Sequence, residues 1–108
     1  MIDVSAAQLK TIRQILVQYV PHTTVWAFGS RVLGTAQPYS DLDLAIVGTE
    51  KIPRATLTQL KEAFVASDIP FRVDILDWHR VSPAFQQIIA AQFVPLLVSD
   101  EIDTNEVV

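Results

Sequence analysis

The sequence predicts an α+β domain with a sandwich-like arrangement, in which helices and strands alternate along the chain. Three observations support this class. Apolar residues recur at helical spacing in three long segments. Short runs of strand-forming residues lie between those segments. The connections are short and are marked by proline, glycine and serine. The expected order is helix, strand, helix, strand, helix, strand, helix, followed by one more apolar segment.

Recognisable caps mark where the long helices are expected to begin. Ser5 and Gln8 form a capping-box pattern. Pro53 fits the first position of the next long helix. Ser82 and Pro83 fit the cap and first residue of the last one. The residues expected to face the core from these helices are Leu9, Ile12, Leu16, Tyr19, Leu57, Leu60, Phe64, Phe85, Ile88 and Ile89.

The second predicted strand begins with two carboxylates and continues as an apolar run. Side chains alternate between the two faces of a strand, so Leu42, Leu44 and Ile46 are expected on one face. Asp41 and Asp43 are expected on the other face. The nearly continuous apolar run indicates a strand that is covered on both sides. The expected strands are 25–28, 41–47 and 71–76, with 93–98 as either a short strand or an extended packing segment.

Composition limits the class of protein. With 108 residues, half of them hydrophobic, the chain can bury a core as one domain. The absence of cysteine excludes disulfides, thiolate nucleophiles and zinc–thiolate sites. No apolar run is long enough to span a bilayer, and no leader pattern is seen at the start. The expected location is therefore cytoplasmic.

The net charge of −4 comes from the end of the chain. Four acidic residues lie in the last ten positions, and without them acids and bases balance. A neutral body disfavours bulk electrostatic binding to DNA or RNA. We therefore expect one domain at 1–98 and an acidic C-terminal tail at 99–108, either a frayed terminus or a segment for a basic partner. The four residues are Asp100, Glu101, Asp103 and Glu106.

The segment between the first two strands combines a tight turn with the carboxylate pair. Gly29 ends a strand and lets the backbone approach a ligand. Ser30 fits the cap of a short helix at 30–33, whose first amides would suit a phosphate. Asp41 and Asp43 project from one face and suit a hard cation such as Mg²⁺. Together these features indicate chemistry on a nucleoside triphosphate.

A third carboxylate, Asp74, lies inside the third apolar strand. If it is buried, it needs a cation, hydrogen-bond donors or a raised pKa. The alternative is an aspartate on an edge strand, or one paired with Arg72. Asp77 is a competing candidate at the end of the strand, where a capping or loop role is more usual.

The motif resembles the signature of the DNA polymerase β-type nucleotidyltransferase superfamily. Gly29-Ser30 is followed after ten residues by Asp41-x-Asp43, with Asp74 as the third strand carboxylate. The motif Gly-Ser-Arg-x-x-Gly-Thr-Ala before Ser-Asp-Leu-Asp-Leu is similar to the motif of minimal nucleotidyltransferases. These proteins are the antitoxins of HEPN/MNT toxin–antitoxin pairs. The resemblance runs from the first helix to Val98. It implies the nucleotidyltransferase fold, a small mixed β-sheet packed against about four helices.

The resemblance also implies a two-metal site for Mg²⁺, with Mn²⁺ as a substitute, and ATP as substrate. Asp41 and Asp43 would hold the metal on the triphosphate, and with Asp74 they would hold the second metal. Asp74 could also act as general base. Gly29 and Ser30 would bind the phosphates. Arg31 would add a charge-assisted contact, or else be a surface arginine paired with an acid.

The implied function is transfer of AMP from ATP to a hydroxyl of a cognate HEPN ribonuclease toxin, with a tyrosine as the implied acceptor. This modification would neutralise the toxin. The partners would be that toxin and ATP, with no membrane and no direct nucleic-acid binding. Small size supports this function, because relatives that modify other acceptors carry an additional domain. Two alternatives stay open. One is a non-catalytic module that binds nucleotide or caps the toxin, and the other is transfer to a small molecule such as an aminoglycoside.

Overall fold

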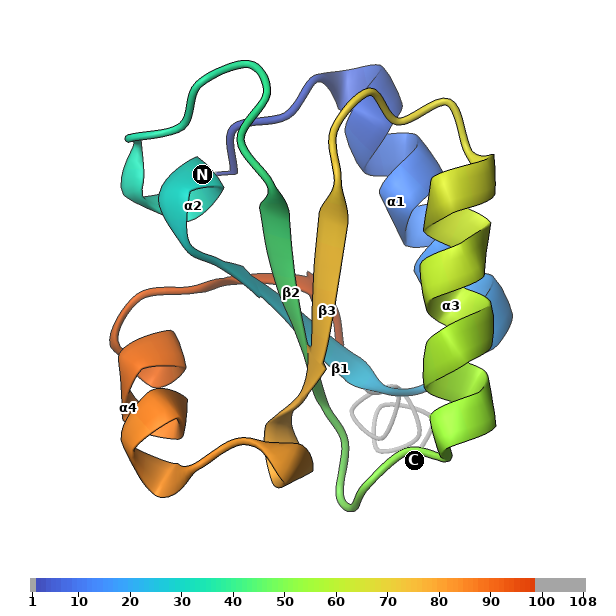
Figure 1. Ribbon diagram of the computed structural model, residues 1–108, viewed down its shortest axis with the longest axis vertical. Coiled ribbons are helices and arrows are strands. Elements are labelled where there is room, and N and C mark those ends of the chain that lie inside the picture. The colour runs from blue at the N-terminus through green and yellow to red at the C-terminus, as the bar shows by residue number, and fades with distance from the viewer. Residues whose placement is uncertain (1, 99–108) are drawn as a thin grey trace, which may run out of the picture.

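The computed structural model describes residues 2–98 and contains a four-stranded sheet with helices on both faces (Figure 1). Helices α1 and α3 pack together on one face, and α4 packs on the other. The expected alternation of helices and strands is confirmed. The elements are α1 (Ala6–Tyr19), β1 (Thr24–Phe28), α2 (Ser30–Leu33), β2 (Leu42–Val47), α3 (Arg54–Ala66), β3 (Val73–Asp77), the 3₁₀ turn η1 (Trp78–Arg80), α4 (Pro83–Ala91) and β4 (Val94–Leu97).

The sheet is mixed and has the order β3-β2-β1-β4. Strand β1 pairs antiparallel with both β2 and β4, while β2 pairs parallel with β3. Parallel neighbours need a crossover, and α3 supplies it. The apolar segment 93–98 contains the fourth strand, so the first of its two expected forms is confirmed. The acidic segment 99–108 lies outside the described residues.

Strand β2 divides its side chains between two hydrophobic layers, as its sequence predicts. Leu42, Leu44 and Ile46 are fully buried in the larger layer, under α1 and α3. Ala45 packs in the smaller layer with Phe28 and α4. Full burial of a leucine or isoleucine side chain contributes about 1.5–3 kcal/mol. The carboxyl groups at the start of β2 are therefore carried by one of the most firmly held strands of the sheet.

The predicted caps at Ser5 and Ser82 are present, whereas one helix start and one predicted core residue need correction. Ser5 and Gln8 form the complete capping box, and Ser82 caps α4 by accepting from the Phe85 amide at 3.2 Å. Pro53 is the N-cap of α3 and not its first residue. Ile88 is 64% exposed and does not face inward, because the short α4 covers the sheet with only part of its surface. Within residues 2–98, no helix is long and apolar enough to cross a bilayer.

Candidate active site

The turn between β1 and α2 is built on Gly29. Its φ of +80° and ψ of −159° fall in a region that is essentially restricted to glycine. Its carbonyl accepts from the amides of Val32 and Leu33 at 2.9 and 3.0 Å, which starts the short helix. The prediction that Ser30 caps this helix is wrong, since Gly29 is the cap and Ser30 is the first helical residue. Gly34 ends the helix in the left-handed conformation, which agrees with the short helix expected at 30–33.

Gly29 also lies directly against Asp43 of the neighbouring strand. Phe28 and Asp43 are paired in the antiparallel register of β1 and β2. A Cβ atom on Gly29 would overlap Oδ2 of Asp43 and would lie 3.1 Å from its Cγ. The glycine turn, which we define as Gly29-Ser30, thus contacts Asp43 at a point where residue 29 can carry no side chain.

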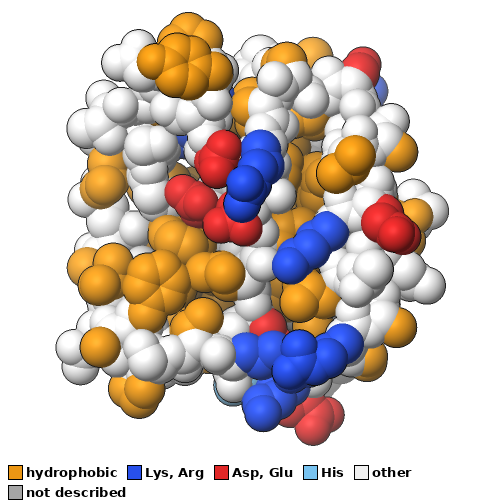
Figure 2. All heavy atoms as spheres, viewed as in Figure 1, with side chains coloured by type: hydrophobic (Ala, Val, Ile, Leu, Met, Phe, Trp, Pro, Cys, Tyr) orange, Lys and Arg blue, Asp and Glu red, His pale blue; other side chains and the backbone are white. Residues whose placement is uncertain are grey.

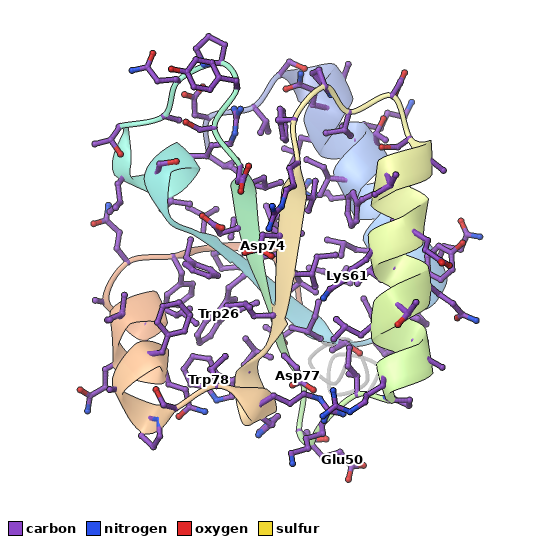
Figure 3. All side chains as sticks on the ribbon, viewed as in Figure 1. Trp26, Glu50, Lys61, Asp74, Asp77 and Trp78 are labelled. Atoms are coloured by element: carbon purple, nitrogen blue, oxygen red, sulfur yellow. The ribbon has the colours of Figure 1, made fainter. Side chains whose placement is uncertain are left out.

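Strand pairing brings the three predicted carboxylates together. Asp43 and Asp74 are partners in the parallel register of β2 and β3, and Asp41 lies two residues before Asp43. We call Asp41, Asp43 and Asp74 the carboxylate cluster. Figure 2 shows acidic side chains gathered on one face of the molecule with a basic side chain against them, and Figure 3 shows Asp74 beside β2. Residues 31 positions apart in the chain thus share one site.

The surroundings of Asp43 raise its pKa. Burial, then the charges of Asp74 and Asp41, raise the pKa of Asp43 from 3.8 to about 6, and Arg72 acts in the opposite direction. The sequence suggested burial for Asp74, but its side chain is 41% exposed on the edge strand β3. Asp43 lies on the inner strand β2, against Gly29, and burial is the largest cause of its raised pKa.

Arg72 lies between two members of the cluster. Its Nε is 3.8 Å from Oδ2 of Asp41, and one terminal nitrogen is 3.8 Å from Oδ1 of Asp74. The sequence offered two alternatives for Asp74, an edge-strand position and a pairing with Arg72, and both are present. Asp74 also lies next to Asp43, as expected for a member of the cluster. Exposed ion pairs of this kind contribute about 0–1 kcal/mol. A role for Arg72 at the cluster itself was not predicted.

The cluster offers donors of the right chemistry for a hard cation. Three carboxyl groups occupy neighbouring positions at the start of β2 and in β3, and Mg²⁺ favours carboxylate and phosphate oxygens over nitrogen or sulfur. In the part of the chain that the structure describes, no group of three or more His, Asp or Glu side chains is already arranged to hold a metal ion. A metal would therefore have to draw these carboxylates together.

Arg31 is a buried brace for the loop that leads into the cluster. It is 4% exposed and donates to the carbonyls of Asp3, Pro38 and Ser40 at 2.8, 2.9 and 3.0 Å. Its guanidinium carbon lies 3.9 Å from the ring centre of Phe71. These contacts give Arg31 a structural role, and its burial excludes the surface ion pair that the sequence suggested as an alternative. The triphosphate contact that the family resemblance implied for Arg31 stays a prediction.

Replacing Arg31 with lysine is expected to lower the free energy of unfolding by about 2–3 kcal/mol. Lysine keeps the charge but cannot donate to three carbonyls in the guanidinium geometry, and buried acceptors without partners cost about 1–3 kcal/mol. Urea unfolding measures the change. Arg54→Lys, at the exposed start of α3, is the control. Equal stability of the two variants would contradict the brace.

Asp77 and the residues after it form a separate structural group at the other end of β3, as Figure 3 shows. Asp77 is buried and accepts from the amides of Ile52 and His79, each at 3.0 Å, and from Arg80 at 3.2 Å. Trp78 packs edge-on against another tryptophan at 5.4 Å. The capping role expected for Asp77 is confirmed, and Asp77 is not part of the carboxylate cluster.

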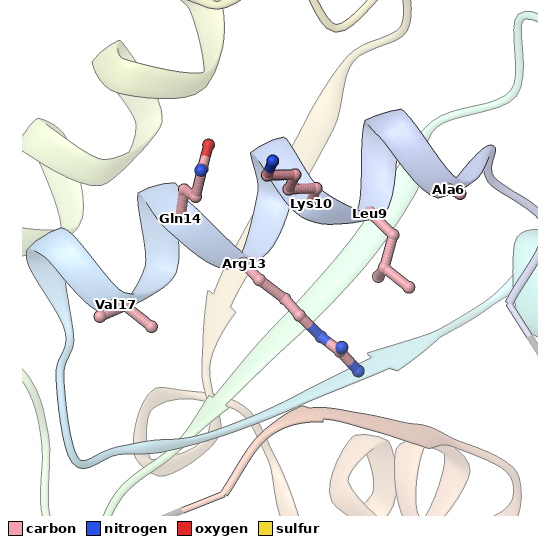
Figure 4. Close-up of a pocket in the computed structure, with 6 residues that line it drawn as sticks. All are labelled: Ala6, Leu9, Lys10, Arg13, Gln14 and Val17. Atoms are coloured by element: carbon pink, nitrogen blue, oxygen red, sulfur yellow. The ribbon is translucent and has the colours of Figure 1, made fainter.

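A cavity of about 600 Å³ opens on the outer surface of α1 (Figure 4). Its lining contains no member of the carboxylate cluster and neither residue of the glycine turn. The cavity therefore does not belong to the candidate active site. The lining residues are Ala6, Leu9, Lys10, Arg13, Gln14 and Val17.

Two comparisons of sequence identify the family of this chain. Residues 10–102 match the family described as polymerase beta, nucleotidyltransferase. A Haemophilus influenzae protein described as a probable protein adenylyltransferase MntA is 50% identical over 93 residues, which cover 86% of this chain and 82% of that protein. The glycine turn and all three carboxylates lie within the matched family range.

Solved structures share the fold. A toxin–antitoxin with AMP-PNP aligns with a TM-score of 0.71 and 24% identity, covering 89% of this chain and 77% of that chain. A tri-AMPylated Shewanella oneidensis HEPN toxin in complex with MNT antitoxin aligns with a TM-score of 0.66 and 22% identity, covering 91% and 76% of the two chains. At this identity the likeness establishes the nucleotidyltransferase fold that the sequence predicted.

Proposed function

Because the chain belongs to the polymerase β nucleotidyltransferase family, we propose that it is an antitoxin that transfers AMP from ATP to a hydroxyl of a HEPN-domain toxin. The observation that carries the proposal is the position of Asp43, which touches the glycine turn and pairs with Asp74. One contact thus links a phosphate-binding turn to the carboxylate cluster. The 50% identity to a probable protein adenylyltransferase supports protein as the acceptor.

Asp41, Asp43 and Asp74 are the proposed ligands of two Mg²⁺ ions, which Mn²⁺ can replace. Burial, and then repulsion from Asp74 and Asp41, raise the pKa of Asp43, so a divalent cation would remove an electrostatic cost that is already present. Bound there, the ions would lower the pKa of an attacking hydroxyl and neutralise charge on the phosphates.

The chain's own residues would orient the reactants. Gly29 and Ser30 would hold the triphosphate at the turn, where a side chain on Gly29 would displace Asp43. Asp74, whose side chain is 41% exposed on the edge strand, would take the proton from the acceptor hydroxyl. The hydroxyl oxygen would then bond to the α-phosphorus while the bond to pyrophosphate breaks.

The acceptor is proposed to be a tyrosine hydroxyl of the cognate toxin. The two solved neighbours described above are toxin–antitoxin assemblies, and one contains an AMPylated HEPN toxin. A partner that completes the site fits a cluster that lies open at the edge of the sheet. We expect the reaction in the cytoplasm, which supplies ATP, with no role for a membrane or for direct nucleic-acid binding.

The test is the intact mass of the cognate HEPN protein after co-expression with this chain. A gain of one or more AMP units is expected with the native chain and none with the Asp41→Asn/Asp43→Asn variant. Asp68→Asn, which removes an exposed carboxylate elsewhere, should behave like the native chain. An unmodified toxin that still co-purifies would reject the transfer reaction and leave a binding module.

A further inference from the structure

We propose that Arg72 is an exchangeable counter-cation of the active site. In the metal-free protein its single positive charge offsets part of the negative charge of the carboxylate cluster. When a divalent metal binds together with a nucleotide, Arg72 leaves the carboxylates and pairs with the polyphosphate. The inference rests on the proposed function, because it assumes that the cluster binds metal and nucleotide.

The position of Arg72 follows from the strand register. Leu42 pairs with Val73, and the Leu42 amide donates to the Arg72 carbonyl at 2.9 Å. One step before that pair, Arg72 lies beside Asp41, and side-chain alternation puts it on the same face as Asp74. The backbone of Arg72 is thus fixed by a hydrogen bond, while its side chain reaches over the cluster.

The guanidinium spans the cluster without being locked to it. Two different nitrogens lie 3.8 Å from Asp41 and from Asp74, which is longer than the 2.7–3.2 Å of a hydrogen bond. The side chain is 72% exposed, in contrast to the buried Arg31. Arg72 is therefore close enough to offset the negative charge and loose enough to be displaced.

Arg72 also acts on the carboxylate that it does not directly pair with. It opposes the rise in the pKa of Asp43, and no other basic group of the described residues is among the causes of that shift. The two ion pairs engage Asp41 and Asp74, the carboxylates on either side of Asp43. A metal ion would have to take its place among the same oxygens.

Competition with Arg72 has opposite consequences for two ligands. A metal ion alone must displace the guanidinium and leave it without a partner. A metal–nucleotide complex brings phosphate oxygens, which match the planar donor fork of arginine. Arg72 should therefore weaken the binding of metal alone and strengthen the binding of the metal–nucleotide complex, so that the two ligands load together.

The test measures both affinities in the protein alone, without toxin. Isothermal titration follows Mn²⁺ binding in the absence of nucleotide, and then α,β-methylene-ATP binding in saturating Mg²⁺. For Arg72→Gln we expect Mn²⁺ to bind about five- to tenfold tighter, and the nucleotide analogue to bind weaker by a similar factor. Arg72→Lys, which keeps the charge, should fall between the native protein and Arg72→Gln in both titrations.

Lys61→Gln is the matched control, because it removes one positive charge from the exposed surface of α3 (Figure 3) without being among the causes of the Asp43 shift. It should leave both affinities within about twofold of native. Equal or weaker Mn²⁺ binding by Arg72→Gln would overturn the counter-cation. Tighter Mn²⁺ binding with unchanged nucleotide binding would overturn the exchange to phosphate.

Failure of the proposed function would look different. If neither the native chain nor Arg72→Gln bound Mn²⁺ with or without nucleotide, the carboxylate cluster would not be a metal site, and the inference would fall with it. If the native chain bound Mn²⁺ and Asp41→Asn/Asp43→Asn did not, the cluster would stand as the metal site. The affinities of the native chain and of Arg72→Gln would then test the role of Arg72 independently of the proposed function.

Discussion

Replacing Asp43 with asparagine is expected to abolish AMP transfer and, in the metal-free protein, to stabilise the fold. Loss of a metal ligand removes several kcal/mol of charge stabilisation in the transition state, or about a thousandfold in rate. The same change relieves repulsion from Asp74 and Asp41 and the cost of burying a charge. We expect a gain of about 1 kcal/mol at pH 7, less than the full pKa shift implies, because solvent screens this half-exposed group.

The stabilisation should depend on pH in a defined direction. The folded-state pKa of Asp43 is raised from 3.8 to about 6, so within this window the folded protein binds a proton that the unfolded chain has lost. The contribution of Asp43 to the free energy of unfolding therefore falls as pH rises from about 4 to about 6, and stays low above that. The advantage of Asp43→Asn should be absent near pH 4 and complete by about pH 7.

Urea unfolding with EDTA at pH 4.5 and at pH 7 measures this difference. Asp68→Asn serves as the control, since its carboxylate is exposed and lies outside the cluster. An Asp43→Asn variant that is less stable than the native chain at pH 7 would show that the charge of Asp43 is favourable in the metal-free fold. Retention of AMP transfer by the same variant would reject Asp43 as a metal ligand.

Replacing Gly29 with alanine is expected to abolish transfer and to lower the free energy of unfolding by about 3 kcal/mol. Two costs combine. The backbone conformation of Gly29 is nearly closed to other residues, at about 1–3 kcal/mol. The new methyl group would also overlap Oδ2 of Asp43, and forced contacts of this kind cost about 1–3 kcal/mol. To relieve this overlap, the Asp43 side chain would have to move away from Asp41 and Asp74.

Gly34→Ala separates these costs. Gly34 has a nearly identical φ of +82°, but its ψ of 17° lies in the ordinary left-handed region, and a Cβ atom there would meet nothing within 4 Å. We expect this variant to lose about 1 kcal/mol and to keep transfer activity. Urea unfolding and the toxin mass assay compare the two variants. Similar losses in both would mean that contact with Asp43 is unimportant.

The sequence predicted those parts of the site that depend on local pattern. The alternation of side chains along a strand is a property of the chain itself, so the two faces of β2 and the shared face of Asp41 and Asp43 could be read in advance. The same holds for the capping box at Ser5 and for the helix that ends at Gly34. The role of Asp74 came from the family resemblance, and the strand register then placed it opposite Asp43.

The parts that depend on packing could not be predicted in the same way. Arg31 looks like a surface residue of a one-turn helix, and only the path of the N-terminal segment and of the loop at 37–40 buries it. The raised pKa belongs to Asp43 because β2 is an inner strand and β3 an edge strand, an order that the sequence does not contain. Arg72 offered one signal, its position two residues before Asp74.

The parallel pairing of β2 with β3 has a consequence for how the chain folds. Asp43 and Asp74 meet only after the intervening crossover has closed, a step that carries a loop-closure cost. That step also brings the like charges of Asp43 and Asp74 together. A nascent chain that ends with α3 already contains the glycine turn and two of the carboxylates, but it lacks Asp74 and Arg72. Completion of the edge strand is therefore the step that gives the chain all three carboxylates of the site.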